Sequence, residues 1–434
     1  MKDKAKLIDV AKNFVIVLLF ISAIFLLFKA VTNDSTSVYE SLSKLFGGST
    51  GERVVNQTGS VSSGNAASPV FFLTTTEDGS HYAVKYDSQI KEKIVSQFSS
   101  YLGEALGTAG TLTEVSKEQW QKALGGSGVF FDYLYPQSLS AIASWLGYET
   151  KGEIDSKTAR RLFLGNNDGN LILFFINDGD GKFYSSKTTY KFSSLAPKIA
   201  EFPIGTAKFA FELDKDYAAL DPYFIFSHES VTLRAVTVSN PLREGFDGLD
   251  LIGFFGMNSH VAQDYKETDG SEVYVDGEKT LRIEKMSGVI SFSVTDNNGI
   301  YLNSSSGPLS ITDCISACYE IAKSTVEPTF GDAVLGLINV TNALTPSSCR
   351  IDFGYFVDGI PVTLPEGGYA ASFQISQGAI VKAELNCRKY TFSGGTVPAL
   401  PEKQATAIAD SKGGEPVLTY EDKTNSVNCT WIIN

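Results

Sequence analysis

The sequence is poor in the residues on which most enzymatic chemistry depends. Its 434 residues include three histidines, His81, His228 and His260, which are far apart in the chain. It has no H-E-x-x-H zinc motif, no phosphate-binding P-loop and no credible catalytic triad. Because no other metal-ligating side chain is spaced around His228 or His260, we expect both at the surface or in ordinary packing. We therefore predict that the protein is not an enzyme and has no catalytic residue, cofactor or metal site.

Basic residues are also scarce. The chain has 36 Lys and Arg against 49 Asp and Glu, which gives a formal net charge of −13. Nucleic acid favours proteins rich in Lys and Arg, so we expect no nucleic-acid partner. In contrast, 43% of the residues are hydrophobic, with 29 Phe and 19 Tyr, which is enough for a substantial core. The length after the first 31 residues suggests about two or three domains.

The few cysteines are confined to the last part of the chain. Cys349, Cys387 and Cys429 share the apolar faces of predicted strands, and Cys314 and Cys318 lie on the apolar stripe of a predicted helix. We expect all five in the core as free thiols, where Cys behaves as a small hydrophobic residue. The alternatives are one helix-to-sheet or strand-to-strand disulfide, or a structural metal. A bridge between Cys314 and Cys318 is disfavoured, because Cβ atoms four residues apart on a helix are about 5–6 Å apart, against about 3.8 Å in a disulfide.

One long hydrophobic run predicts a membrane helix. Residues 14–28 are FVIVLLFISAIFLLF, and with Ala30 and Val31 the apolar stretch reaches about 18 residues, or about 27 Å of helix. Four lysines precede the run and one follows it, so the positive-inside rule places the N-terminus in the cytoplasm. We predict a protein of the cell membrane, with a cytoplasmic tail at 1–12, a single transmembrane helix at 13–31 and a C-terminal part outside the cytoplasm.

A cleaved secretory signal peptide is the alternative interpretation of this run. Signal peptides usually have an apolar region of about 7–15 residues that ends in a small-x-small cleavage site. This run is longer and ends in Phe28-Lys29-Ala30-Val31, so an uncleaved anchor fits better. Residues 32–68 are rich in Ser, Thr, Gly and Asn, which is typical of a flexible tether.

The rest of the chain alternates β-rich runs with amphipathic helices, which predicts an α+β ectodomain of helices packed on antiparallel β-meanders. We expect three modules, at 69–206, 207–306 and 307–434. Helices are expected from Ser88 to about Leu106, at Ser116–Leu124 with a Ser116/Gln119 capping box, at Ser138–Leu146, around Gly248–Phe255, from about Leu309 to Lys323 and at Pro401–Ala409. Strands are expected at 69–76, 81–87, 171–176, 182–188, 272–275, 280–284 and 289–295, and four alternating segments near 351–357, 369–375, 379–385 and 427–433 predict half-buried strands with one face on the core.

The Asp-Gly pairs at 177–181, Asn-Asp-Gly-Asp-Gly, allow two interpretations. In a calcium loop of the EF-hand type, an acid or Asn is expected where Lys182 stands, and a Glu where Thr189 stands. A hairpin turn between the flanking strands is therefore the better interpretation.

Two segments resemble a known family. Residues 263–294 contain the pattern Y-x-x-x-D-G-x-x-V-Y-x-D-G-x-x-T-L-x-I, and residues 349–390 contain F-x-Y-x-x-D-G-x-P-V. They are followed by LPEKQATAIAD and a terminal strand that ends in Trp431-Ile432-Ile433. In this order, behind one N-terminal anchor, these features resemble the YycH/YycI family of Gram-positive bacteria, and its YycH members more than the shorter YycI ones. The resemblance covers the anchor and roughly residues 200–434 well, and residues 69–200 by general layout.

The resemblance implies a function that no single motif demonstrates. Members of the family are membrane-anchored extracytoplasmic accessory proteins that modulate an essential cell-wall-sensing histidine kinase. For this chain the resemblance implies a non-enzymatic role in two-component signalling and cell-wall homeostasis. The implied partners are the membrane, a sensor histidine kinase and a paralogous anchored regulator. Two alternatives stay open. One is a ligand-binding module for a wall fragment, lipid or peptide, and the other is a wall-modifying hydrolase with two carboxylates about 5–10 Å apart.

The membrane helix itself offers candidate partner-contact residues. Membrane helices associate through small residues that allow close approach and polar groups that bond across the interface. Ser22, Ala23 and Ala30 form such a patch in a helix otherwise made of bulky apolar residues. The alternative is that the Ser22 hydroxyl bonds back to the Leu18 carbonyl within its own helix.

The lysine distribution makes the topology testable. Protease added to intact protoplasts is expected to digest the protein from residue 32 onward, because the predicted orientation exposes that part on the outer side. Western blotting with antibodies against each end of the chain measures the result. Protection of the C-terminal part would contradict the orientation, and release of soluble protein lacking residues 1–31 would show a signal peptide instead.

Overall fold

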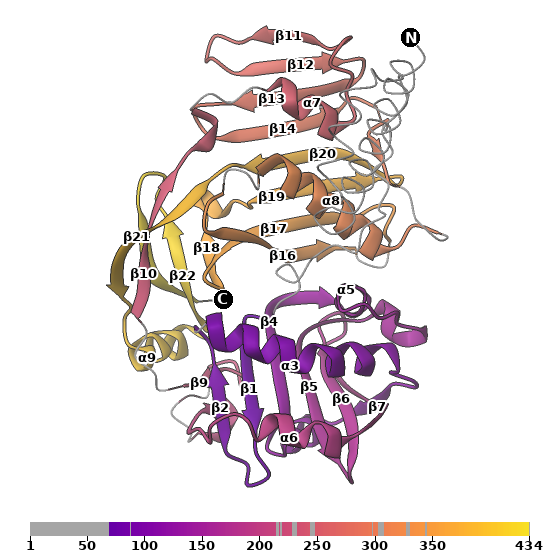
Figure 1. Ribbon diagram of the computed structural model, residues 1–434, viewed down its shortest axis with the longest axis vertical. Coiled ribbons are helices and arrows are strands. Elements are labelled where there is room, and N and C mark those ends of the chain that lie inside the picture. The colour runs from indigo at the N-terminus through magenta and orange to yellow at the C-terminus, as the bar shows by residue number, and fades with distance from the viewer. Residues whose placement is uncertain are drawn as a thin grey trace, which may run out of the picture. The chain divides into compact units, whose positions relative to one another are not determined.

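A computed structural model describes residues 69–86, 88–213, 217, 219–227, 232–243, 248–296, 298–302, 308–326, 330–342 and 345–433 (Figure 1). All of them belong to one compact unit. The predicted cytoplasmic tail, membrane helix and tether lie outside the described residues. Within the described ranges, no helix has the length and apolar character needed to cross a membrane.

The structure is α+β, with antiparallel sheets and a few helices. The α-helices are α3 (Ser88–Gly107), α4 (Lys117–Leu124), α5 (Leu139–Trp145), α6 (Ala196–Ile199), α7 (Leu249–Ile252), α8 (Ile311–Val326) and α9 (Glu402–Lys412). Short 3-10 helices include η1 (Gly152–Ser156), η3 (Ala210–Glu212) and η6 (Gly253–Phe255). The predicted helices are confirmed to within a few residues at each end.

The N-terminal strands are β1 (Phe71–Thr75), β2 (His81–Val84), β3 (Thr113–Val115), β4 (Gly128–Ser138), β5 (Thr158–Asn167), β6 (Asn170–Asn177), β7 (Lys182–Lys191), β8 (Lys208–Phe209), β9 (Ile225–Phe226) and β10 (Thr232–Ser239). The later strands are β11 (Gln263–Lys266), β12 (Glu272–Asp276), β13 (Lys279–Glu284), β14 (Val289–Val294), β15 (Ile300–Tyr301), β16 (Ala333–Thr341), β17 (Arg350–Val357), β18 (Ile360–Thr363), β19 (Ala371–Ser376), β20 (Ala379–Asn386), β21 (Lys389–Pro398), β22 (Pro416–Asp422) and β23 (Val427–Ile433).

Local signals in the sequence account for several element boundaries. At the start of α4, the Gln119 backbone N–H donates to Ser116 Oγ at 3.2 Å, and the Ser116 backbone N–H donates to Gln119 Oε1 at 2.8 Å. This capping box satisfies backbone groups that the helix itself leaves free, so the prediction is confirmed. The segment at 177–181 connects the antiparallel strands β6 and β7, as the hairpin interpretation predicts.

The N-terminal sheet is buried on both faces. Its seven strands have the order β2-β1-β4-β5-β6-β7-β3. Residues of one parity, such as Phe131 and Phe175, pack under α3 and α5. Residues of the other parity, such as Phe130 and Phe163, pack against Trp120 of α4. Burial on both faces explains why these strands are continuous apolar runs, such as LILFF, instead of alternating ones.

The second face of this sheet is also covered by a segment that follows it in the chain. Phe209, Tyr223 and Ile225, from the segment that contains β8 and β9, pack in the same cluster as Trp120. The boundary expected at residue 206 therefore falls before a segment that packs on the N-terminal sheet.

A twelve-stranded sheet forms the C-terminal part of the fold. Its main path is β11-β12-β13-β14-β20-β19-β17-β18-β22-β23, with β15 on β20 and β16 on β17. The helices α7 and α8 lie over one face of it (Figure 1), and residues such as Ile315, Phe292 and Phe373 form the core between them. Because this sheet contains β11–β14 as well as the later strands, the boundary expected at residue 306 falls within it.

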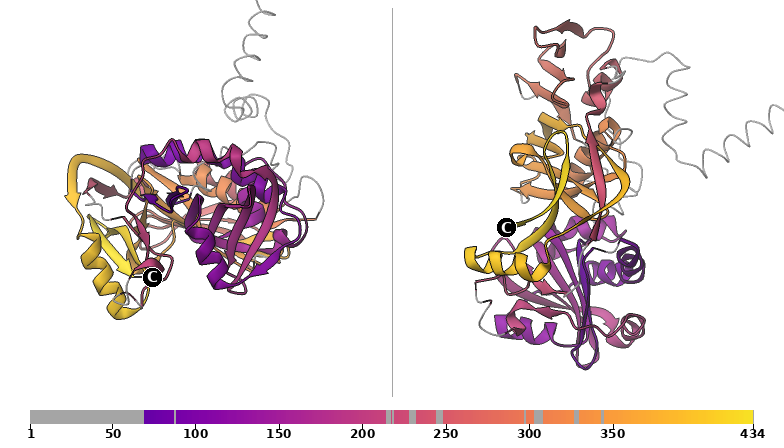
Figure 2. Two further views of the ribbon diagram at one scale, coloured as in Figure 1. Left: turned by 90° about the horizontal axis from the view of Figure 1, so that it is seen from below. Right: turned by 90° about the vertical axis from the view of Figure 1, so that its left-hand side faces the viewer.

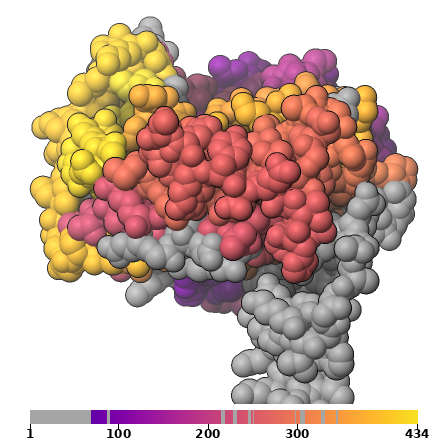
Figure 3. Space-filling view, turned by 90° about the horizontal axis from the view of Figure 1, so that it is seen from above, coloured from indigo at the N-terminus to yellow at the C-terminus, as the bar shows by residue number. Residues whose placement is uncertain are grey.

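Two further strand pairings complete the fold. The strands β10 and β21 pair as a two-stranded antiparallel ribbon, and β18 pairs with β22 in parallel. Figure 2 shows α9 and the yellow C-terminal strands beside the indigo N-terminal sheet. At the other end of the large sheet, β11 is an exposed edge strand (Figure 3), with 51% of Tyr265 accessible to solvent.

The alternation near residues 351–357 does not mark a half-buried strand. In β17 every residue after Arg350 is buried, on both faces. The second face is covered because Phe356 packs in a cluster with Phe71, Leu134 and Val417, at the junction with the N-terminal sheet. β19 alternates as predicted, and β20 does so from Lys382 onward, whereas at its start Ile380 is buried and the expected core residue Val381 is only half-buried, next to a register shift between the two strands.

The last strand departs from its prediction in the opposite sense. Val427, Cys429, Trp431 and Ile433 of β23 are only half-buried, because β23 is the last strand on the path of the sheet and pairs with β22 alone. The prediction that Cys429 lies in the core is therefore wrong, whereas the burial of the other four cysteines is confirmed.

Truncating Phe356 is expected to loosen the junction between the sheets. The Phe356→Ala substitution should lower the free energy of unfolding by about 3–5 kcal/mol, because it removes a buried ring and leaves a cavity. Urea unfolding followed by circular dichroism measures this effect. The matched control is Met286→Ala, whose side chain is 69% exposed and whose loss should stay within about 0.5 kcal/mol. Equal losses in the two variants would contradict the assignment of Phe356 to the junction.

Candidate functional site

The candidate contact residues predicted from the sequence, Ser22, Ala23 and Ala30, lie outside the described residues. So does His228. Among the described histidines, His260 is exposed, as expected. His81 is buried, with Nδ1 2.9 Å from Thr75 Oγ1 and Nε2 3.0 Å from Glu212 Oε1. It therefore serves the packing of the N-terminal sheet.

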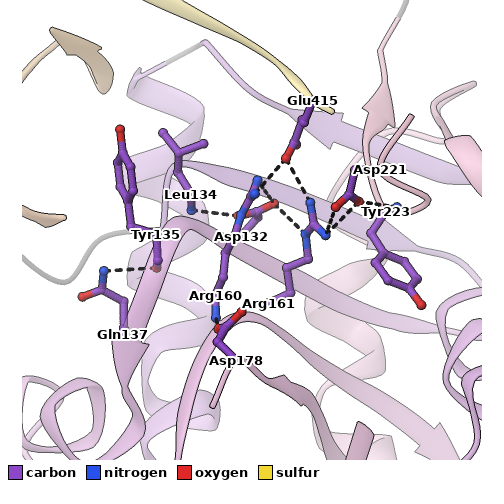
Figure 4. A network of polar contacts seen from close by, with 10 residues as sticks. All are labelled: Asp132, Leu134, Tyr135, Gln137, Arg160, Arg161, Asp178, Asp221, Tyr223 and Glu415. Carbon is purple, nitrogen blue, oxygen red and sulfur yellow. Dashed lines mark hydrogen bonds and ion pairs between the residues drawn. The ribbon is translucent and has the colours of Figure 1, made fainter. Parts of the chain in front are cut away.

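The most unusual chemical feature of the described residues is a buried network of charges (Figure 4). At its centre, the Asp132 carboxylate on β4 lies between two consecutive arginines of β5. Arg160 donates from Nε to Oδ1 at 2.7 Å and from Nη2 to Oδ2 at 2.9 Å. Arg161 donates from Nε to Oδ2 at 3.1 Å. Asp132 is 1% exposed, so the carboxylate depends on these two guanidinium groups in place of water.

An irregularity in β4 positions the carboxylate. β4 pairs with β5 up to Asp132 and resumes pairing at Gln137. Within the bulge Leu134 has a φ of 66°, a left-handed conformation that is uncommon for a side chain of this size. Asp132 Oδ1 accepts the Leu134 backbone N–H at 2.7 Å, which holds the turn. The bulge also carries Gln137, whose side chain donates to the Leu337 carbonyl of β16 at 3.1 Å.

The network extends beyond the N-terminal sheet to distant parts of the chain. Glu415, immediately before β22, accepts from Arg160 Nη1 at 2.7 Å and from Arg161 Nη2 at 3.1 Å. Asp221 lies in the segment that contains β8 and β9. Its carboxylate accepts from Arg161 Nη1, at 2.8 Å on Oδ1 and at 3.0 Å on Oδ2. The two arginines therefore connect the N-terminal sheet to the C-terminal sheet and to the segment between them.

The charges in the network hold one another ionised. Burial alone would raise the pKa of Asp132, but the positive charges of Arg160 and Arg161 outweigh it and hold the pKa below its ordinary value. Burial alone would lower the pKa of Arg160, but the carboxylates of Asp132 and Glu415 raise it well above its ordinary value. Because Asp132 keeps its charge and all its bonds are internal, it is a structural anion and a poor proton donor.

A second buried ion pair lies at the same junction. Lys85 Nζ, after β2, is 2.5 Å from Glu402 Oε1 at the start of α9, and both side chains are almost fully buried. The lysine also lies 4.2 Å from the ring centre of Phe224. Glu402 Oε2 accepts the Ser227 backbone N–H at 3.0 Å. Burial would raise the pKa of Glu402, but the charge of Lys85 lowers it below the ordinary value.

The surface offers hollows of a different chemistry. One, of about 310 Å³, lies on the outward face of β17, β19 and β20 and is lined by Arg350, Gly368, Tyr369, Ser372, Gln374, Lys382, Glu384 and Asn386. A second, of about 380 Å³, shares Gln374 and Lys382 with it. Most of the residues that line the two hollows are polar or charged. In the part of the chain that the structure describes, no group of three or more His, Cys, Asp or Glu side chains is placed to hold a metal ion.

Sequence reasoning missed the charge network, although one signal for it was present. Arg160-Arg161 interrupts the apolar strand sequence ARRLFL, and charges in a buried strand require partners. The identity of those partners had no signal, because Glu415 is 254 residues from Arg161 in the chain.

The motifs behind the family resemblance occupy defined turns. The Y-x-x-x-D-G pattern spans β11, its turn and β12, and the following Asp276-Gly277 forms the turn between β12 and β13. The F-x-Y-x-x-D-G-x-P-V pattern spans the β17–β18 hairpin. Its turn residues Asp358 and Gly359 have φ angles of 56° and 74°, as a type I′ turn requires.

No protein-family model and no curated protein matches the chain. Among solved structures, the crystal structure of YycH from Bacillus subtilis matches with a TM-score of 0.56 over 88% of this chain and 97% of that chain. The fold is YycH-like. The two sequences are 12% identical, so this likeness shows the fold and confirms the family resemblance at that level. Because the uncovered 12% of this chain is fewer residues than 69–200 contains, the YycH-like fold extends into that part, which the sequence resemblance covered only by layout.

The central carboxylate of the network is expected to control stability and its dependence on acid. Asp132→Asn should lower the free energy of unfolding at pH 7 by about 3–5 kcal/mol, because it leaves two buried arginines short of a counter-charge. Since the pKa of Asp132 is lowered in the folded state, its contribution is complete above the unfolded pKa of about 3.9 and is lost as the pH falls through the folded value. The free energy of unfolding of the variant should therefore fall less steeply with acid than that of the wild type, because the variant has no Asp132 carboxylate to protonate.

Urea unfolding at pH 7 and through the acid range below pH 5 measures both effects. Asp168→Asn is the matched control, because Asp168 is exposed in the β5–β6 turn and Asn tolerates its φ of 51°. An Asp132→Asn variant as stable as this control would show that the network contributes nothing to the junction.

Proposed function

We propose that this protein is a membrane-anchored, extracytoplasmic accessory protein that regulates a two-component sensor histidine kinase through protein contacts. The observation that carries the proposal is the YycH-like fold over 88% of the chain, together with the two family-like motifs at the β11–β13 and β17–β18 turns. The resemblance of those motifs implies a role in cell-wall homeostasis and a paralogous anchored regulator as a further partner. The apolar run at 14–28 supplies the proposed anchor.

The function can be tested in the cell that encodes the protein. The measurement uses a reporter gene expressed from a promoter that the sensor kinase controls. Deleting the gene for this protein should raise or lower the reporter output, and expressing residues 1–434 again should restore the original output. A kinase and response regulator encoded immediately upstream would identify the pair to be measured. Unchanged output in the deletion would contradict the proposal.

A ligand-binding module is the second candidate, and the two adjoining hollows on the outward sheet face favour it. Their shared residues, Gln374 and Lys382, can donate hydrogen bonds to a polar ligand such as a wall fragment. The test adds a wall fragment to cells that carry the reporter. If the protein binds the fragment, Lys382→Ala should abolish the change in reporter output that the fragment causes and should leave the basal output at its wild-type level. If regulation is by contact alone, Lys382→Ala should change neither the basal output nor the output with the fragment.

The membrane-helix contact gives a test within the proposal. Ser22→Leu combined with Ala23→Leu should weaken crosslinking to the transmembrane helix of the sensor kinase, because bulky side chains prevent close approach and remove the hydroxyl. Each interhelical bond of this kind contributes about 0.6–2 kcal/mol, so a severalfold loss of crosslinked product is expected.

The matched control is Ile21→Leu combined with Ile24→Leu, which changes the same region of the helix without adding bulk at the small residues. Membrane insertion, measured by carbonate extraction, should be equal in all variants. Unchanged crosslinking in the Ser22/Ala23 double variant would place the recognition surface in the ectodomain.

A further inference from the structure

Three of the five cysteines meet at one place in the C-terminal core. Cys314 and Cys318 lie one turn apart on α8, and Cys349 immediately precedes β17; all three are buried. Cys387, after β20, and Cys429, on β23, lie elsewhere in the sheet. The fold therefore brings together thiols from a helix and a strand that β16 and a turn separate in the chain.

Cys314 and Cys349 share one hydrogen-bond acceptor. Both thiols donate to the carbonyl oxygen of Pro346, from sulfur atoms 3.4 and 3.5 Å away, so the two sulfur atoms lie side by side. A disulfide needs two Cβ atoms about 3.8 Å apart, a separation open to side chains that approach from facing elements. Cys314 and Cys318, four residues apart on one helix, cannot reach it without distortion.

We propose that Cys314 and Cys349 are an oxidative modification site, at which a small hydroperoxide converts the two thiols into a disulfide that joins α8 to β17. The pair is distinct from the charge network and from the hollows, and the inference does not depend on the proposed function. It also selects, from the alternatives left open by the sequence, one helix-to-sheet pairing.

The chemistry balances with hydrogen peroxide as the oxidant. The Cys349 thiolate attacks one peroxide oxygen, so that an S–O bond forms, the O–O bond breaks and the departing hydroxide takes up a proton to become water. The Cys314 sulfur then attacks the Cys349 sulfur, so that the S–S bond forms, the S–O bond breaks and the hydroxyl leaves with the Cys314 proton as a second water. The two thiols lose two electrons in total, and the peroxide gains them.

The proximity of the two thiols assigns their roles. The neighbouring Cys314 thiol lowers the pKa of Cys349 below its ordinary value, and the neighbouring Cys349 thiol together with burial raises the pKa of Cys314. Because the thiolate is the nucleophile, Cys349 attacks the oxidant and Cys314 resolves the sulfenic acid. Cys318 is wholly buried, and its burial raises its pKa well above the ordinary value, which makes it the least reactive of the three.

A surface turn gives the oxidant a route to Cys349. Thr345, Ser347 and Ser348 in front of it are exposed. Two backbone hydrogen bonds lie within the turn, from Thr345 N–H to the Asn342 carbonyl and from Ser348 N–H to the Thr345 carbonyl, both at 2.8 Å, and a third, from Gly378 N–H to the Ser347 carbonyl at 3.0 Å, ties it to the β19–β20 turn. Local opening of such a turn requires far less free energy than unfolding of the sheet, and peroxide is small enough to enter through it.

The decisive measurement uses the wild-type, full-length protein. After exposure to hydrogen peroxide at neutral pH and unfolding in an alkylating reagent, the protein should have lost two of its five thiols. A non-reduced digest analysed by mass spectrometry should contain one linked pair of peptides, carrying Cys314 and Cys349, and dithiothreitol should separate them. Retention of all five thiols, a link that involves another cysteine, or sulfinic acid at Cys349 without a link would each overturn the proposal.

Two variants separate the pair from its neighbour. Cys318→Ala should form the same linked peptides as the wild type, whereas Cys314→Ala should form none and should accumulate sulfenic or sulfinic acid at Cys349. If either variant fails to fold, the wild-type digest alone still decides the question. The oxidised wild type should also unfold at a higher temperature than the reduced protein, because the bond restricts the unfolded chain.

Discussion

The carboxylate of Asp132 between Arg160 and Arg161 is the constraint on which the junction of the two sheets depends. Each buried charge costs several kcal/mol unless a partner compensates it, and here the partners come from three separate parts of the chain. The arginines on β5 are satisfied only when Glu415 and Asp221 are in place. Such a network favours one arrangement over other compact ones, because any partial arrangement leaves a charge unpaired.

Apolar packing at the junction acts together with this network. Phe356 of β17 packs against Phe71 and Leu134, and Leu134 belongs to the bulge that Asp132 holds. The same bulge carries Gln137 to the β16 backbone. One irregularity of β4 therefore serves the ion network, the apolar cluster and the direct hydrogen bond between the sheets, which is why a strained φ at Leu134 is tolerated. The described residues accordingly belong to one compact unit.

The parts of the structure that could be predicted from the sequence are those that local patterns determine. Helical periodicity located α3 and α8, the Ser116/Gln119 box located the start of α4, and Asp-Gly pairs located hairpin turns. The predictions failed where long-range packing decides. The alternation of β17 cannot reveal that Phe356 meets the N-terminal sheet, and that of β23 cannot reveal its place at the end of the sheet. Likewise, Arg160-Arg161 indicates that buried partners exist but cannot indicate Glu415, because pairing across the chain leaves no periodic trace.

The strand β17 relates the cysteine pair to the junction. Cys349 immediately precedes it, Phe356 lies near its other end, and its residues pair with β16 on one side and with β19 on the other. A strand bonded on both sides moves as part of its sheet, so a restraint on the residue just before it acts on the whole strand. A disulfide from α8 to Cys349 would fix the helix against the sheet that also packs on the N-terminal sheet through Phe356. The bond would shift the protein toward those states in which α8 lies close to Cys349, because a covalent link shifts an equilibrium only when the two states differ in the distance that it fixes.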